Sequence, residues 1–251
     1  MDSGRVASGE TNRLLDTLPA AQRHRLTAAI NHVWLEPKTV LFEPRQHIDV
    51  VDFPRTCVVS LVTPFHDGTI VEVAAVGSEG IVGVPLALGG ALAVQAICSV
   101  GGWSDRMDAT TFTHEVESDG DLHKVVDDYV RAVFNQLSQA VACNRLHSTT
   151  ERLARWLLAS GDRIGTDEFA ISNQLLGRLL GSSDAAVRRC SLTLHAAGLI
   201  NSRDGRMTIV NRPGLEAIAC ECYRIIKMEL DGVLRRARTR FRGARALAVR
   251  E

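Results

Sequence analysis

The spacing of hydrophobic residues predicts short strands in the first part of the chain. Runs rich in Val, Ile and Thr occupy residues 39–44, 57–64, 69–76 and 94–100. The pair Asp67-Gly68 separates two of these runs and is a strong hairpin signal. Ahead of the strands, residues 12–31 predict one or two short helices broken at Pro19. Short strands at such close spacing favour a sandwich or a barrel.

A long amphipathic helix is predicted from about Leu122 to His147. Its apolar positions recur in steps of four and three, which is the 3.5-residue period of a two-stranded coiled coil. The expected seam of the coiled coil is Val126, Val130, Val133, Leu137, Ala140 and Asn144. The length of the run favours a helix that dimerises. The alternative is an ordinary amphipathic helix that is docked on its own domain.

The pattern after residue 150 predicts a winged helix-turn-helix. Gly181 can adopt the left-handed conformation that ends a helix, and Ser182 or Ser183 can cap the helix that follows. That helix has an inward stripe of Val187, Ser191 and Leu194. The other expected elements are helices at 151–164, 173–180 and 212–227, a short extended piece at 169–172, and two strands within 198–210 that form a hairpin around Asp204-Gly205.

Charge is unevenly distributed along the 251 residues, although the formal net charge is zero. Residues 1–150 contain 11 Lys+Arg and 18 Asp+Glu, whereas residues 151–251 contain 18 and 11, so the two parts carry −7 and +7. A basic domain is a natural partner for a polyanion such as nucleic acid. The alternative is that the two parts balance each other across an interface.

Several classes of protein do not fit the sequence. No apolar run approaches the roughly 20 residues of a membrane span, and the N-terminal segment lacks the apolar core of a secretory signal. We therefore expect a cytoplasmic protein with no membrane partner. An enzyme is not expected, because no nucleophile with its base and no paired-carboxylate site is apparent.

No metal site is expected from the six cysteines. They stand at positions 57, 98, 143, 190, 220 and 222, without a C-x-x-C pair or zinc-type spacing. Cys220 and Cys222 are expected to lie two residues apart on one helix and so to point in different directions. The absence of a secretory signal favours reduced thiols.

Three stretches carry a resemblance to a known family. They are "CNRLHSTTERLARWLL", "ISNQLLGRLLGSSDAAVRRCSLTLHAAGLI" and the strand-rich "LFEPRQHIDVVDFPRTCVVSLVTPFHDGTIVEVAAVGSEGIVGVPLALGG". Together they resemble the Crp/Fnr family of transcription regulators over nearly the whole chain, and "ACECYR" recurs in a subgroup of such proteins. The resemblance implies an α+β fold and a homodimer that binds a pseudo-palindromic operator in double-stranded DNA and acts with RNA polymerase. The implied parts are a cyclic-nucleotide-binding-like β jelly roll at 12–120, a dimerisation helix and hinge at 121–150, a winged helix-turn-helix at 151–226, and an arginine-rich extension at 227–251.

The recognition helix departs from the family pattern. Relatives carry Arg-Glu at its start and a further Arg four positions after the Glu, whereas this chain has Asp184, Ala185 and Arg189. The expected base-reading residues are Ser183, Asp184, Arg188 and Arg189. Asp184 could cap the helix, pair with Arg188, or accept a hydrogen bond from cytosine N4. The first two options are favoured because they need only the protein's own geometry.

The contacts to DNA phosphates are expected from Ser172, Asn173, Arg203 and Arg206. The arginines after Lys227 either add phosphate contacts or belong to a solvated, frayed terminus. A rival function is a dimeric sensor or adaptor that has lost DNA readout, which Asp184 and Ala185 keep open. The presence of Arg189 and of both wing arginines argues against it.

The effector of the N-terminal domain is unknown from the sequence. The glycine-rich stretch 77–90 either brings backbone amides close to a ligand or is a structural turn. The candidate pocket residues are Gly77, Glu79, Gly80 and Gln95. Cyclic AMP is not expected, because the stretch "GGALAVQAI" lacks the arginine that holds the cyclic phosphate in relatives. No cofactor is predicted, because the first cysteine is Cys57 and the N-terminal cluster of the iron–sulfur branch is missing. A haem ligand among the eight histidines stays open.

Overall fold

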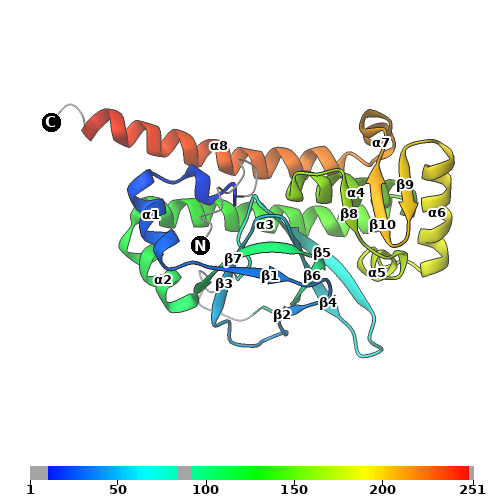
Figure 1. Ribbon diagram of the computed structural model, residues 1–251, viewed down its shortest axis with the longest axis horizontal. Helices are drawn as coiled ribbons and strands as arrows, with labels where there is room; N and C mark the ends of the chain where they lie inside the picture. Colours follow the sequence, from blue (N-terminus) through cyan, green and yellow to red (C-terminus); the bar gives the residue numbers. More distant parts are fainter. Residues whose placement is uncertain (1–10, 84–91, 249–251) are drawn as a thin grey trace, which may run out of the picture.

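The computed structural model describes residues 11–83 and 92–248. A β roll lies against two long helices, α3 and α8, and a smaller domain that contains α4 to α7 lies at one end of these helices (Figure 1). The chain begins with the 3₁₀ turn η1 (Leu15–Thr17) and helix α1 (Ala20–Ala28). Pro19 separates the two, as predicted. Among the described residues, none of the helices combines the length and the hydrophobicity that a membrane span requires.

The roll consists of two antiparallel sheets. Their orders are β1-β7-β3 and β2-β6-β4-β5. The strands are β1 (Asn31–Leu35), β2 (Val40–Phe42), β3 (Val50–Pro54), β4 (Val58–Pro64), β5 (Ile70–Val76), β6 (Gln95–Val100) and β7 (Gly102–Asp108). The predicted strands correspond to β2, β4, β5 and β6 and are confirmed, as is the turn at Gly68, which has a φ of +79°.

The sheet β1-β7-β3 was not predicted, because polar residues interrupt its hydrophobic pattern. Asp52 is buried in β3, where Arg106 of β7 donates two hydrogen bonds to its carboxylate at 2.9–3.3 Å. Burial raises the pKa of Asp52, and the arginine opposes that rise. The carboxylate is thus accommodated inside the sheet by a partner that the alternation of residue types does not reveal.

Helix α2 (Ala109–Ser118) leads into α3 (Gly120–Leu146), which Asp119 caps by accepting hydrogen bonds from two backbone N–H groups. The predicted seam on α3 is wrong in part. Val126 and Val133 are buried in the chain's own core, and Asn144 accepts a hydrogen bond from Arg152. The apolar stripe at the surface instead follows Val130, Phe134, Leu137 and Val141, and we call it the α3 stripe.

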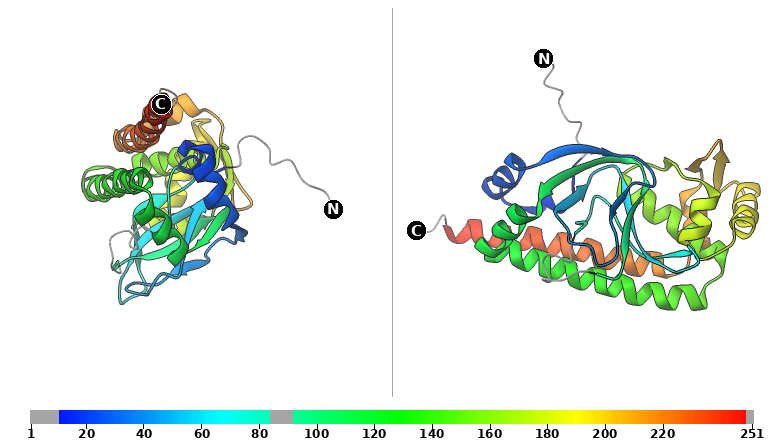
Figure 2. Two further views of the ribbon diagram at one scale, coloured as in Figure 1. Left: turned by 90° about the vertical axis from the view of Figure 1, so that its left-hand side faces the viewer. Right: turned by 90° about the horizontal axis from the view of Figure 1, so that it is seen from below.

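Helix α8 (Cys222–Ala248) packs antiparallel along α3, and the two helices lie side by side in Figures 1 and 2. Its buried face follows a heptad-like spacing: Tyr223, Ile226, Leu230, Val233, Leu234, Ala237 and Phe241. Arg236 and Arg240 pair with the buried Asp128 of α3. Up to Ala248 the arginine-rich segment is therefore part of α8, which runs across the expected boundary at residue 226.

The C-terminal domain has the predicted order of helices and strands. Its elements are α4 (Thr149–Ile164), β8 (Glu168–Ala170), α5 (Asn173–Leu179), α6 (Asp184–Ala196), β9 (Ile200–Arg203), β10 (Arg206–Ile209) and α7 (Arg212–Ile218). Ser148 and Glu151 form a capping box at the start of α4. The single helix predicted at 212–227 is wrong, since α7 ends at Ile218 and α8 begins at Cys222.

The roll and the C-terminal domain share one continuous hydrophobic core. Val62 and Ile70 of the roll belong to the same buried cluster as Trp156 of α4 and Leu176 of α5. Removing this surface from water stabilises the contact at roughly 25 cal/mol for each Å² of apolar area. The roll and the C-terminal domain therefore pack against each other and are not independent domains joined by a linker.

A substitution in α8 tests whether this helix is part of the fold. We expect Leu234→Ala to lower the free energy of unfolding by about 2–5 kcal/mol, because it opens a cavity between α8 and the core. The neighbouring exposed Arg235→Ala should change it by less than about 0.5 kcal/mol. Urea unfolding followed by circular dichroism measures both, and equal effects of the two variants would contradict the packing of α8.

Candidate nucleic-acid interface

The turn between α5 and α6 has the geometry of a helix-turn-helix. The hydroxyl of Ser172 accepts a hydrogen bond from the Leu175 backbone, and Ser183 caps α6 in the same way through Ala186. Gly181 has a φ of +57°, which ends α5 sharply. A Cβ on Gly177 would lie 3.0 Å from the backbone oxygen of Ser182, so this glycine allows the turn to fold back on its helix.

Helix α6 separates buried and exposed residues cleanly. Val187 and Leu194 are fully buried and Ser191 nearly so, which confirms the predicted inward stripe. Arg188 and Arg189 are exposed on the opposite side. The outer face also carries Ala185, and Leu192, whose side chain is 62% exposed. Sequence reasoning missed Leu192 as a site residue, although its position three residues after Arg189 places it on the same face.

Asp184 takes the two roles that need only the protein's own geometry. It stands in the first turn of α6, where its charge complements the helix dipole. Its carboxylate also accepts a hydrogen bond at 3.2 Å from Arg188, one turn further along the helix. Arg188 is thereby held at the start of the helix, whereas Arg189 lies one residue further on the exposed face.

The wing is the hairpin β9–β10. Asp204 and Gly205 both have positive φ angles, 52° and 73°, as a type I′ turn requires. Arg203 and Arg206 stand opposite each other at its tip and are exposed. The Arg206 guanidinium also donates to Glu168 of β8 at 2.8 Å, which ties the wing to the third strand of the sheet.

The two expected phosphate contacts on α5 are already engaged inside the domain. The Ser172 hydroxyl caps α5, and the side-chain oxygen of Asn173 accepts a hydrogen bond from Ser191 at 3.2 Å. Both residues nevertheless stand at the N-terminus of α5, on the helix that precedes α6. Their positions agree with a role beside the recognition helix, and their contacts show that they also hold α5 and α6 together.

The expected effector residues belong mainly to a joint between the domains, which corrects the sequence interpretation. The Glu79 carboxylate accepts a hydrogen bond at 2.9 Å from Arg163 of α4, and both side chains are more than 90% buried. A Cβ on Gly77 would collide with Arg163, and one on Gly80 would collide with the hydroxyl of Tyr129. These glycines therefore serve the close approach of helices to the loop after β5.

The Arg163 guanidinium completes this joint with two further hydrogen bonds. It donates to the backbone oxygen of Ala75 and to the side-chain oxygen of Gln136, each at 3.1 Å. Three elements thus meet at one cation: β5 and its following loop, α3, and α4. The fourth expected effector residue, Gln95, lies elsewhere, where it donates to Glu43 at 2.7 Å in a solvent-exposed contact. Residues 84–90 of the glycine-rich stretch lie outside the described residues.

The helix-turn-helix also rests directly on the β4–β5 hairpin. Arg178 of α5 donates to the backbone oxygen of Gly68 at 3.2 Å, and the indole N–H of Trp156 donates to Glu72 at 3.1 Å. A Cβ on Gly181 would stand 3.4 Å from the Val71 side chain. The position of α5 and α6 is therefore fixed by the roll as well as by α4.

A cavity of about 180 Å³ lies between the roll and α3. Its described lining is entirely apolar: Phe42, Leu61, Val76, Ile81, Val82, Gly83, Leu92, Val130, Val133, Phe134 and Leu137. A charged ligand buried against this lining would lose its hydration without gaining a partner. Three of the four residues in the α3 stripe also line this cavity.

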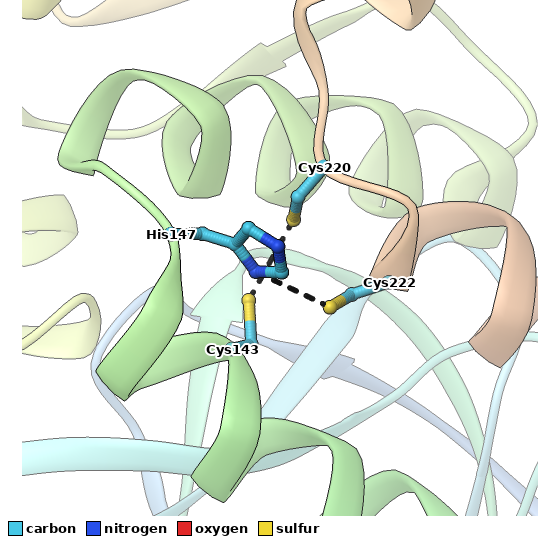
Figure 3. Close-up of side chains that lie close together, drawn as sticks. All are labelled: Cys143, His147, Cys220 and Cys222. Carbon is cyan, nitrogen blue, oxygen red and sulfur yellow. Dashed lines mark hydrogen bonds between the residues drawn. The ribbon is translucent and has the colours of Figure 1, made fainter.

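Four potential metal ligands converge where α3 ends and α8 begins (Figure 3). Cys143 and His147 stand one turn apart at the end of α3, Cys220 lies in the turn after α7, and Cys222 opens α8. Their ligand atoms all lie within 4.8 Å of one another. The expectation that Cys220 and Cys222 diverge on one helix is wrong, because Cys220 lies in the turn after α7 and only Cys222 belongs to α8.

The thiols of this cluster share hydrogen bonds. The Sγ atoms of Cys143 and Cys220 are 3.6 Å apart, and the same distance separates Cys222 Sγ from His147 Nδ1. The hydrogen bond from Cys220 and, more weakly, the Arg155 guanidinium outweigh the effect of burial and together lower the pKa of Cys143 to about 5. The pKa of Cys220 rises correspondingly, because its proton is held by its neighbour.

The fold and the exposed basic face of α6 define a β-roll protein with a winged helix-turn-helix. Residues 151–218 match the family model of the Crp-like helix-turn-helix domain. The described fold is similar to FixK2 from Bradyrhizobium japonicum, with a TM-score of 0.65 and 16% identity over 76% of this chain and 98% of that one. A comparison with curated protein sequences gives no match.

Two further solved structures share this fold at a similar level. The c-di-GMP-responsive global regulator CLP of Xanthomonas campestris has a TM-score of 0.59 at 16% identity, over 76% of this chain and 99% of that one. A CRP-family transcriptional regulator from Thermus thermophilus, TTHB099, has a TM-score of 0.61 at 15% identity, over 75% and 96%. Residues 151–218 thus form a Crp-like helix-turn-helix domain, and the described fold is similar to that of Crp/Fnr-family regulators, in agreement with the resemblance seen in the sequence.

The joint and the recognition helix offer a direct contrast between a buried and an exposed ion pair. We expect Glu79→Gln to lower the free energy of unfolding by about 3–5 kcal/mol, because it leaves the Arg163 charge buried without its counter-ion. Asp184→Asn removes an exposed pair and should cost less than about 1 kcal/mol. Chemical unfolding of both variants checks this, and a Glu79→Gln protein as stable as the wild type would refute a structural role of the joint.

Proposed function

We propose that this regulator is a homodimer that recognises a specific, two-fold symmetric DNA sequence and responds to a small effector in the roll. The observation that carries the proposal is the outer face of α6, where Arg188 and Arg189 are exposed beside a wing with two exposed arginines. This face belongs to the part of the chain with a formal charge of +7. A basic recognition helix beside a basic hairpin is the surface that a DNA duplex requires.

Arg189 is the residue expected to read a base. An arginine on the exposed face of a recognition helix can donate two hydrogen bonds to O6 and N7 of guanine. Arg188 can also contact DNA once its ion pair with Asp184 is broken. Leu192 can contact a thymine methyl group. Ser183 stays a predicted base contact at the start of α6. Ser172, Asn173, Arg203 and Arg206 would then set the position of the domain on the sugar-phosphate backbone.

A second copy of the chain is the expected partner of the α3 stripe. Its residues follow the four-three-four spacing of a coiled-coil seam, and the side chains of Phe134 and Val141 are 67% and 73% exposed. A dimer about this stripe would present two copies of α6. Recognition helices related by such a two-fold axis bind successive major grooves about 34 Å apart. RNA polymerase is the further partner expected of a regulator of this class.

The chemistry of the roll cavity favours a small, uncharged, apolar effector. A volume of about 180 Å³ is below the roughly 300 Å³ at which pockets for drug-sized ligands begin, and its lining offers no partner for a phosphate. Cyclic AMP therefore stays an unfavoured ligand. An occupant would touch Val130, Phe134 and Leu137, so that filling the cavity would act directly on the stripe that forms the dimer.

Selection of bound sequences from random duplex DNA tests the recognition proposal. We expect the purified protein to enrich a two-fold site with half-sites one helical turn apart. Arg189→Ala should lose about 1–3 kcal/mol of discrimination at one base pair of each half-site, because it loses its contacts to the base edge. Arg235→Ala, on the exposed side of α8, removes the same charge away from α6 and should keep the site.

The outcome also separates the proposal from the rival function. Weak DNA binding whose affinity only falls with rising salt, without an enriched sequence, would favour an adaptor. In such an adaptor the Arg188–Asp184 ion pair would persist and no base would be read. Enrichment that Arg189→Ala leaves unchanged would contradict the assignment of this residue while leaving DNA recognition in place.

The oligomeric state tests the α3 stripe. Phe134→Glu should convert a dimer into a monomer in sedimentation velocity, because a buried carboxylate without a partner is costly at a dimer interface. Lys124→Glu introduces the same side chain at an exposed position of α3 away from the stripe and should leave the dimer intact. A wild-type protein that sediments as a monomer at micromolar concentration would overturn the proposed dimer.

A further inference from the structure

The cluster of three cysteines and one histidine at the junction of α3, α7 and α8 is separate from the hydrophobic cores of the described chain. Cys143, Cys220 and Cys222 are buried and form a cluster of their own, separate from the three larger hydrophobic cores of the described chain. Three cysteines alone provide little apolar area, so burial by itself does not explain why they converge. His147 joins them through a ring nitrogen rather than through a hydrophobic contact.

The distances fit a tetrahedral metal ion. Zinc–sulfur bonds of about 2.3 Å at tetrahedral angles place neighbouring sulfur atoms about 3.8 Å apart, and a nitrogen ligand comes slightly closer. The two measured distances, Cys143 Sγ to Cys220 Sγ and Cys222 Sγ to His147 Nδ1, are both 3.6 Å. The sulfur atoms and the imidazole point toward a common centre in Figure 3. All four ligand atoms lie within 4.8 Å of one another.

The polar neighbours are arranged as around a bound metal. His147 Nε2 lies 3.1 Å from the Glu221 carboxylate, which keeps the proton on that nitrogen and turns the lone pair of Nδ1 toward the thiols. The side-chain amide of Gln139 donates to Cys222 Sγ at 3.1 Å, as expected beside a thiolate. A zinc ion with three thiolates carries one net negative charge, which the Arg155 guanidinium can offset.

We propose that Cys143, His147, Cys220 and Cys222 bind one zinc ion. Three thiolates and one imidazole are a set that proteins use for structural zinc, and four protein ligands leave no position for substrate. Binding would displace the thiol protons and release them to solvent. The expectation of no metal site is replaced by this proposal, since the spacing C-x₃-H and C-x-C becomes a site only when α3 and α8 meet.

The place of the site in the chain gives it a specific consequence. The polypeptide enters the DNA-binding domain immediately after His147, at the N-cap of α4, and leaves it at Cys220, after α7. The ion would therefore join the two ends of this domain to each other and to the end of α3. Such a link limits how far the domain can turn relative to α3 when the roll changes its state.

Metal content is the first test of this site. The full chain, purified under reducing conditions, should retain one zinc per chain by inductively coupled plasma mass spectrometry. After removal of the metal, cobalt(II) should give the visible bands of a tetrahedral ion and a near-ultraviolet thiolate charge-transfer band. Retention of no zinc together with no such cobalt spectrum would overturn the proposal, as would a Cys143–Cys220 disulfide in the reduced protein or the absorption of an iron–sulfur cluster.

Variants locate the site and allow for loss of folding. Cys222→Ser should weaken zinc binding strongly, whereas Cys190→Ser, a partly exposed cysteine outside the cluster, should leave it unchanged. Glu221→Gln keeps all four ligands and should weaken zinc by about 10–100-fold through the lost orientation of His147. If Cys222→Ser does not fold, Glu221→Gln decides the question, and unchanged zinc affinity in that variant would refute the assigned geometry. None of these readouts depends on DNA binding.

Discussion

The arrangement of the protein depends on one buried ion pair, Glu79–Arg163. Burying two charges costs several kcal/mol for each ion, and that cost is offset only where geometry and further hydrogen bonds are good. Here Arg163 reaches Glu79, Gln136 and the backbone of Ala75, so that one cation joins the roll, α3 and α4. The geometry is satisfied only when all three elements are in place. The buried polar contact thus selects one relative position of the two domains within a shared apolar core, which alone is less directional.

Helix α3 connects this joint to the α3 stripe, to the roll cavity and to the cysteine–histidine cluster. Its exposed stripe borders the roll cavity, Gln136 contacts the joint, and its last turn carries two of the four cluster ligands at the entry to the DNA-binding domain. A change at the cavity therefore has a continuous packed route to α4 and from there to α6. The docking of α5 on the β4–β5 hairpin adds a second contact between the roll and the recognition unit. Helices α5 and α6 are consequently held both by α4 and by the β4–β5 hairpin of the roll.

Much of the fold and part of the site could be predicted from local sequence patterns. The caps Ser172 and Ser183, the left-handed Gly181 and the wing turn depend on neighbouring residues only, and the structure has them as expected. Other features depend on contacts between distant segments. No pattern among neighbouring residues shows that Arg163 lies against Glu79 or that the helix after Lys227 packs on α3. Nor does such a pattern show that the helix ends at Ile218 and so places Cys220 beside Cys143. The predicted seam differs from the α3 stripe by one residue at alternate positions, because a period of 3.5 fits the buried and the exposed face of this helix equally well.

Hydrogen exchange of the native protein over a series of low urea concentrations tests most directly whether the joint makes one unit of the two domains. Amides in β5, in α3 and in α4 to α6 can be followed separately by mass spectrometry, and segments that open together share one free energy and one urea dependence. We predict a single common opening for these segments in the wild type, which divides into two when Glu79 is replaced by Gln. A wild-type protein in which α4 to α6 open at clearly lower free energy than β5 and α3 would contradict it, because the DNA-binding domain would then move independently of the roll.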